Sequence, residues 1–223
     1  MKRLYILCEG QTEEEFIYSI LNPYLQNVGI FAQPIICMTN KTPTKKYKGG
    51  VSSFSKVKKE LQRLCREHPN EMVTTMFDLY AFPYDALGFE NIPKDAYEKA
   101  KYIENAIAND IGNRFNNMIF NLILHEFEGL LFSDVSAFGI AADQEAVAFL
   151  QSVRNAEPTP EHINESPETA PSKQVEKAIP DYRKPTDGID IAEQVGIEKI
   201  ISECRHFANW VAKLTALAKR EEQ

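Results

Sequence analysis

Short apolar runs alternate with amphipathic segments along the N-terminal part of the chain. The runs that predict β-strands cover residues 3–8, 33–38, 72–78 and 118–125. Helical periodicity appears between them, over residues 12–27, 53–67 and 93–111. Most of the apolar runs are nearly continuous, which is typical of strands covered on both faces. The alternation predicts an α/β fold, with a mainly parallel four-stranded sheet flanked by helices in a Rossmann-like arrangement.

The rest of the chain has a different character. Further helices are expected over residues 129–132, 143–154, 190–195 and 197–219. Residues 156–188 hold six of the 12 prolines, many charges and few large apolar side chains, so we expect an irregular Pro-rich arm there. The C-terminal helix should pack back on the sheet. We therefore predict an α/β domain over residues 1–155, followed by the arm and a helical segment over residues 156–223.

Acidic residues follow three of the predicted strands. Glu9 comes after the first strand, Asp78 ends the third, and Glu126 and Glu128 follow the fourth. The carboxyl ends of parallel strands meet at one edge of a sheet, where open α/β sheets bind ligands. Carboxylates gathered there are suitable ligands for Mg²⁺ or Mn²⁺, so we predict a metal site built from these four acids. The alternative is that they are solvated loop residues, or charges that favour a helix dipole.

The local sequence around these acids suggests further roles. Thr12 is a plausible N-cap for the first helix, with Glu15 completing a capping box. His125 could assist proton transfer or bind phosphate, although a hydrogen-bonded histidine at a strand end is the alternative. The motif around His125 lacks the second histidine of H-E-x-x-H, which disfavours a zinc protease. Lys173, in the arm, could reach a phosphate or could be a solvated surface lysine.

Composition limits the classes of function. The net charge of −7 argues against a general polyanion-binding surface, although a local basic cluster exists at Lys41, Lys45, Lys46 and Lys48. The four cysteines lie far apart, without zinc-like spacing, and fit a reducing cytoplasm. No apolar run approaches the roughly 18 residues of a membrane span, and no signal peptide is recognisable. We expect a cytoplasmic protein without a membrane partner. Glycine-rich nucleotide motifs and G-x-S-x-G are missing from the sequence.

Several motifs carry a family resemblance. They are C-E-G-Q-T-E (8–13), D-L-Y-A-F-P (78–83), H-E-F-E-G-L-L-F-S-D (125–134), S-P-E-T-A-P-S-K (166–173) and C-R-H-F-A-N-W (204–210). An apolar strand followed by E-G-x-x-E, with an aspartate at a later strand end, resembles the Toprim fold of topoisomerases, primases and overcoming-lysogenization-defect nucleases. Along nearly its full length the chain more closely resembles a bacterial family catalogued as domain of unknown function 4276 and grouped with Toprim-like proteins.

The Toprim resemblance implies roles for individual residues. Glu9 would be a general acid/base or a metal ligand, and Asp78 a Mg²⁺ ligand. Toprim enzymes carry D-x-D at the later strand end, whereas Tyr80 stands at the second acidic position here. Glu126 or Glu128 is the natural substitute. The resemblance also implies a role in phage defence beside a partner ATPase.

Two hypotheses of different classes follow. The first is a Mg²⁺-dependent phosphodiesterase that cleaves DNA or RNA. In this case Glu9 would activate the nucleophile or bind the metal, and Asp78 and Glu128 would hold Mg²⁺. Glu126 and His125 would support these residues, and Lys173 would contact a phosphate of the substrate. The second is a non-catalytic Toprim scaffold that regulates or adapts a partner ATPase, which the D-x-Y departure favours. The sequence does not distinguish the first hypothesis from a phosphatase or a nucleotide-transfer enzyme that acts on small phosphates. It does not indicate the oligomeric state.

Overall fold

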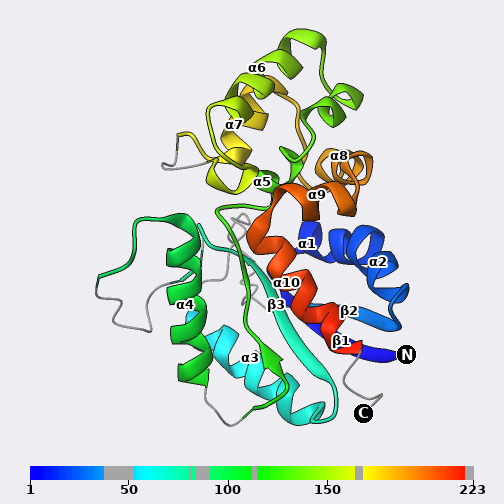
Figure 1. Cartoon of the computed structure of the whole chain (residues 1–223), viewed down its shortest axis with the longest axis vertical. Coiled ribbons are helices and arrows are strands. Elements are labelled where there is room, and N and C mark those ends of the chain that lie inside the picture. The colour runs from blue at the N-terminus through cyan, green and yellow to red at the C-terminus, as the bar shows by residue number, and fades with distance from the viewer. Residues whose placement is uncertain (38–52, 81, 84–90, 112–114, 164–167, 219–223) are drawn as a thin grey trace, which may run out of the picture.

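A parallel β-sheet forms the centre of the molecule (Figure 1). The computed structural model describes residues 1–37, 53–80, 82–83, 91–111, 115–163 and 168–218. The strands are β1 (Lys2–Cys8), β2 (Ile30–Ile36), β3 (Met72–Asp78), β4 (Met118–Ile119) and β5 (Leu122–Ile123). Their order is β2-β1-β3-β4, with β5 also paired to β3, and every pair is parallel. The predicted α/β class and parallel sheet are confirmed.

The strand order reverses between β1 and β3. The chain moves from β1 outward to β2 on one side, then crosses back over β1 to reach β3 on the other. Cys8 near the end of β1 pairs in register with Met76 of β3, so both strands finish at the same edge. In open α/β sheets a crevice forms outside the carboxyl ends at such a reversal, and ligands bind there.

Helices cover both faces of the sheet. On one face lies a continuous N-terminal helix: α1 (Gln11–Phe16), a π-helical turn η1 (Ile17–Leu21) and α2 (Asn22–Gln26). On the other face lie α3 (Phe54–Glu67) and α4 (Ala96–Ile111). Alternation along β1 explains this, since Leu4 and Ile6 point into the first layer while Tyr5 and Leu7 point into the second.

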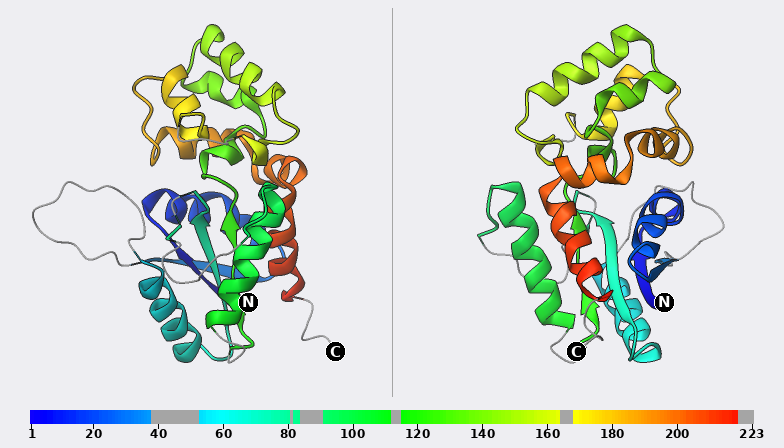
Figure 2. Two further views of the ribbon diagram at one scale, coloured as in Figure 1. Left: turned by 90° about the vertical axis from the view of Figure 1, so that its left-hand side faces the viewer. Right: turned by 45° about the vertical axis from the view of Figure 1, so that its right-hand side comes forward.

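A group of helices stands above the carboxyl edge of the sheet (Figures 1 and 2). Its members are α5 (Glu128–Leu131), η2 (Val135–Ile140), α6 (Gln144–Asn155), η3 (Pro160–His162), α7 (Pro171–Ala178), α8 (Asp187–Val195) and α9 (Ile197–Glu203). The last helix, α10 (Arg205–Ala216), returns along the face that the N-terminal helix also covers. There the Trp210 indole N–H donates a hydrogen bond to Thr74 Oγ1 in β3 at 2.9 Å. One apolar core therefore joins the sheet to the upper helices.

Residues 156–188 form the expected irregular arm only in part. This segment contains η3 and α7, and its sparse apolar side chains, including Ile163 and Val175, are fully buried in the common core. α7 packs against α6 and α5, so a few well-spaced apolar residues were enough to fold it. The expected division after residue 155 falls between α6 and η3, inside this group of helices.

Two other predicted elements are interrupted. The run 118–125 is not one continuous strand, because at Asn121 a side chain takes the place of the backbone hydrogen bonds between strands. The Thr75 hydroxyl accepts a hydrogen bond from the Asn121 N–H and donates one to the Asn121 carbonyl oxygen. The helix expected over 197–219 breaks at Cys204, which lies in extended conformation between α9 and α10.

The basic cluster of Lys41, Lys45, Lys46 and Lys48 lies outside the described residues. Within the described part of the chain, none of the helices combines the length and the apolar character needed to cross a lipid bilayer.

Candidate functional site

Acidic side chains gather at the reversal point between β1 and β3. Glu9 follows β1, Asp78 ends β3, Glu13 lies in α1 and Glu128 begins α5. Asp78, Glu13 and Glu128 are only 7%, 4% and 1% exposed, respectively. Buried carboxylates are costly unless a cation or hydrogen-bond donors compensate them. The cluster therefore requires a source of positive charge.

Lys184 supplies one positive charge at the centre of this cluster. Its Nζ lies 3.1 Å from Glu128 Oε2 and 3.3 Å from Asp78 Oδ2. Glu13 Oε1 lies slightly farther away, at 3.7 Å. The lysine comes from the turn that precedes α8, and α8 packs against both α1 and α5, which brings this turn over the strand ends. One ammonium thus faces three carboxylates.

The pKa values in the cluster reflect this imbalance. Burial raises the pKa of Glu9 to about 7, and the charge of Glu13 adds to the shift, while Lys184 and the backbone of Asp78 oppose it. Burial likewise holds the pKa of Asp78 well above its ordinary value, although Lys184 counteracts it. The pKa of Glu128 is raised for the same reason. In each of these three groups the effect of burial on the pKa outweighs the opposing charge of the single ammonium.

The pKa of Lys184 is raised by the same acidic side chains. Burial alone would lower the pKa of its ammonium group. The charges of Asp78, Glu128 and Glu13 outweigh burial and hold the pKa of Lys184 well above its usual value. The lysine therefore stays charged wherever the surrounding acids are ionised.

Both carboxylate oxygens of Glu13 have a partner near the turn after β1. Gly10, in extended conformation, is the N-cap of α1, and its N–H donates to Glu13 Oε2 at 3.0 Å. The other oxygen of Glu13 faces Lys184. The predicted cap at Thr12 is wrong, because the helix already starts at Gln11 and Glu13, rather than Glu15, is the acid of the capping box.

A left-handed residue turns the chain into α5. His125 has φ 61°, and its carbonyl oxygen accepts a hydrogen bond from Tyr80 N–H at 3.0 Å. Such a conformation costs on the order of 1 kcal/mol for a residue other than glycine and is often found at functional sites. This turn ends the strand and places Glu128 in the first helical turn, at the cluster.

The structure brings together only part of the predicted set. Glu9, Asp78 and Glu128 share the cluster, and Glu126 lies beside it, where its Oε2 accepts a hydrogen bond from Ser172 N–H at 3.0 Å. Lys173 is apart from it, since its ammonium pairs with Glu176 at 2.6 Å on the exposed side of α7. Tyr80 is 43% exposed and contributes no charge to the site.

Sequence reasoning missed Glu13, Lys184 and the nearby Tyr182. Glu13 was visible as the second acid of E-G-x-x-E, whereas Lys184 lies in a segment without any periodic signal. The Tyr182 hydroxyl is buried and has no hydrogen-bond partner among the described residues. Burial is the main cause that raises the pKa of Tyr182, and the charge of Glu128 adds to it.

The donor chemistry of the cluster fits Mg²⁺ or Mn²⁺ better than a softer metal. Its ligand atoms are carboxylate oxygens, and the buried Asp78 Oδ1 has no hydrogen-bond partner in the described part of the chain. As arranged, however, the described residues contain no group of three or more His, Cys, Asp or Glu side chains that would hold an ion. Lys184 lies where such an ion would bind, so metal binding requires this side chain to move aside.

One comparison with known proteins gives a match. Residues 8–215 match the family model described as Domain of unknown function (DUF4276). Neither the curated proteins nor the solved structures contain a significant match.

Proposed function

The chain belongs to the DUF4276 family, and from this premise and the carboxylate cluster we propose that the protein hydrolyses phosphodiester bonds in nucleic acid with the help of Mg²⁺ or Mn²⁺. One observation carries the proposal: three buried carboxylates converge on a single cation position at the reversal point of a parallel sheet. Ligand sites of α/β sheets lie at this position.

The charge balance favours a divalent ion over the lysine alone. Asp78, Glu128 and Glu13 carry three negative charges when ionised, against one on Lys184. Mutual repulsion between carboxylates in a buried site is large, because the effective dielectric constant is low. Asp78, Glu128 and Glu13 would hold the ion, with water or phosphate oxygens completing its coordination. When bound, Mg²⁺ stabilises negative charge on the phosphoryl oxygens and lowers the pKa of a bound water.

The neighbouring side chains have separate roles in this proposal. Glu9 accepts the proton of the attacking water, a role suited to a carboxylate whose pKa is raised to about 7. Lys184, once displaced, contacts a phosphate of the substrate. Glu126 positions the start of α7 through Ser172 N–H. Roles for His125 and Lys173 at the substrate, a partner ATPase and a function in phage defence remain predictions from the sequence.

The same lysine also supports a second candidate. If Lys184 remains in place, its three ion pairs stabilise the cluster without any metal. The protein would then be a non-catalytic scaffold that regulates a partner such as an ATPase. The two candidates differ in a property that can be measured directly, namely binding of a divalent cation.

Calorimetric titration with Mg²⁺ and Mn²⁺ separates the candidates. We expect Mn²⁺ binding by the wild-type protein, loss of binding in Asp78→Asn, and loss of DNA or RNA cleavage in the same variant. Asp110→Asn is the matched control, because this acid pairs with Lys58 on a distant surface. Absence of metal binding in the wild-type protein would refute the enzymatic proposal and support the scaffold. Equal cleavage by Asp78→Asn and the wild-type protein would also refute it.

A further inference from the structure

A groove of about 650 Å³ lies between α4 and α10. These two helices lie side by side in the different views of the molecule, with β4 and β5 close to them (Figures 1 and 2). Residues that line the groove include Lys101, Asn105, Asn121, Arg205, Asn209 and Lys213. Its volume lies within the range of ordinary ligand sites.

The groove carries more positive than negative side chains, although the chain as a whole is acidic. Lys101 and Lys213 are exposed and form no ion pair within the described part of the protein. Arg205 adds a third permanent cation. Two acids also line the groove: Glu98 is exposed, whereas Glu104 is buried and accepts a hydrogen bond from Leu122 N–H. Three permanent cations against two acids give the groove a net charge of +1, in a chain whose net charge is −7.

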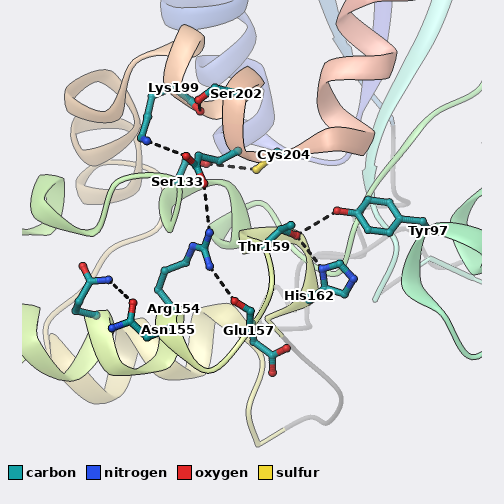
Figure 3. Close-up of polar contacts among 12 residues, drawn as sticks. Tyr97, Ser133, Arg154, Asn155, Glu157, Thr159, His162, Lys199, Ser202 and Cys204 are labelled. Carbon is teal, nitrogen blue, oxygen red and sulfur yellow. Dashed lines mark hydrogen bonds and ion pairs between the residues drawn. The ribbon is translucent and has the colours of Figure 1, made fainter.

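Arg205 is held in place before any ligand binds. Its guanidinium carbon lies 4.4 Å from the centroid of the Tyr97 ring. The Tyr97 hydroxyl shares a hydrogen bond with Thr159 Oγ1 at 3.1 Å, and Thr159 Oγ1 shares another with His162 Nδ1 at 2.8 Å (Figure 3). This network joins α4 to η3. A fixed guanidinium loses less conformational entropy when it binds a phosphate.

The floor of the groove contains an unpaired donor. Asn121 is 3% exposed, and its Nδ2 is buried without a hydrogen-bond partner among the described residues. A buried amide without a partner costs about 1–3 kcal/mol, so it needs an explanation. A polar ligand in the groove would supply one once the side chains that cover Nδ2 move, because this atom is itself closed to solvent. The exposed amides of Asn105 and Asn209 flank the same space.

We propose that this groove binds a single strand of nucleic acid, which specifies the substrate class of the hydrolysis proposed above and rests on that proposal. Lys101, Arg205 and Lys213 contact phosphates, because cationic side chains dominate affinity for the nucleic-acid backbone. The side-chain amides face the bases, whose edges carry both donors and acceptors.

One residue of the groove lies beside the strand that carries Asp78. Asn121 lies beside Thr75 of β3, three residues before Asp78, which corresponds to about 10 Å along the strand. The same chain segment continues from Asn121 through β5 to Glu126 and Glu128. The proposal requires a strand bound in the groove to extend over this distance to the cluster.

Fluorescence anisotropy with a labelled twelve-nucleotide single strand, in EDTA, tests binding apart from cleavage. We expect Lys101→Glu/Lys213→Glu to weaken binding roughly 20-fold at about 0.1 M salt and to reduce the slope of log K against log salt by about 1.4. The matched control is Lys59→Glu/Arg66→Glu on the exposed surface of α3, which changes net charge equally. It should bind within about twofold of the wild-type protein.

The outcomes separate this inference from the proposed function. If both double variants weakened strand binding equally, the proposal that the groove binds the strand would be wrong. Tighter binding of a duplex than of the single strand would also contradict it. Neither result affects metal binding at the cluster. Conversely, selective loss of strand binding in the groove variant would support the groove even if the wild-type protein failed to bind Mn²⁺.

Discussion

The buried carboxylate of Glu161 accepts a hydrogen bond from the backbone N–H of Phe207 at 2.9 Å, across 46 residues of sequence. Its other oxygen accepts from His206 N–H, also at 2.9 Å. The N-cap of α10, Cys204, provides no side-chain cap, so Glu161 satisfies donors that the helix leaves open. A residue of η3 thus fixes the start of the helix that carries Arg205.

Replacing Glu161 should therefore destabilise the protein strongly. Glu161→Ala leaves one buried and one partly buried N–H group without acceptors, and we expect a loss of about 3 kcal/mol in the free energy of unfolding. Glu161→Gln keeps one acceptor oxygen and should lose less. Urea denaturation measures both, with the exposed Glu193→Ala as control, expected within about 0.5 kcal/mol of the wild-type protein. If Glu161→Ala were as stable as the control, this capping role would be wrong.

Removal of the central cation tests what the carboxylate cluster needs. Lys184→Met leaves Asp78, Glu128 and Glu13 without their counter-ion, so we expect a loss of about 3 kcal/mol in metal-free buffer at neutral pH. Mn²⁺ should restore stability and bind this variant more tightly than the wild-type protein, since the ammonium no longer competes. Thermal denaturation with and without Mn²⁺ measures this.

The control for the lysine is Lys173→Met, because Lys173 pairs with Glu176 on an exposed surface. It should change neither stability nor its response to Mn²⁺. A destabilised Lys184→Met that Mn²⁺ fails to rescue would argue for the scaffold role, in which the lysine is the permanent counter-ion.

Glu9 should make stability fall as pH rises. Its pKa is raised from 4.5 to about 7 in the folded protein, chiefly by burial. Between these values the folded state retains a proton that the unfolded state has released, so increasing pH favours unfolding. The stability contribution is complete below pH 4.5 and lost as pH rises through about 7. Glu9→Gln removes this dependence, because the amide does not titrate.

Melting temperatures from pH 5 to 8 in EDTA provide the measurement. The wild-type protein should lose more stability over this range than Glu9→Gln, while the exposed Glu15→Gln should follow the wild-type curve. Asp78 and Glu128, whose pKa values are also raised, contribute in the same direction in every variant. Parallel curves for the wild-type protein and Glu9→Gln would contradict the raised pKa.

The sequence predicted those features that depend on local patterns. β1, β3 and α3 have bounds within a residue of those expected, because a continuous apolar run or a regular helical period defines each. The placement of Glu9 and Asp78 at one edge also followed from parallel strands. Lys184 could not be predicted, since it meets Asp78 across 106 residues and its segment has no period of its own. The strand break at Asn121 depends on a side chain of another strand, Thr75.

The packing between Gly188 and Tyr182 gives a last test of how the Lys184 turn is held. A Cβ added at Gly188 would lie 2.6 Å from the Tyr182 hydroxyl oxygen, too close for both atoms to remain in place. Gly188→Ala should therefore cost about 1–3 kcal/mol of stability. Gly139→Ala is the control for helix propensity, because nothing lies within 4 Å of its added Cβ.

Tyr182→Phe removes the atom with which that Cβ collides. Alone it should be nearly neutral or stabilising, because the buried hydroxyl has no hydrogen-bond partner among the described residues. In the double variant it should recover part of the loss, although the Tyr182 Cζ atom remains at 3.5 Å. A coupling energy above about 0.5 kcal/mol in the double-mutant cycle would confirm direct contact. Strictly additive effects would show that the turn carrying Lys184 relaxes independently of α8, and Lys184 could then leave the cluster without disturbing that helix.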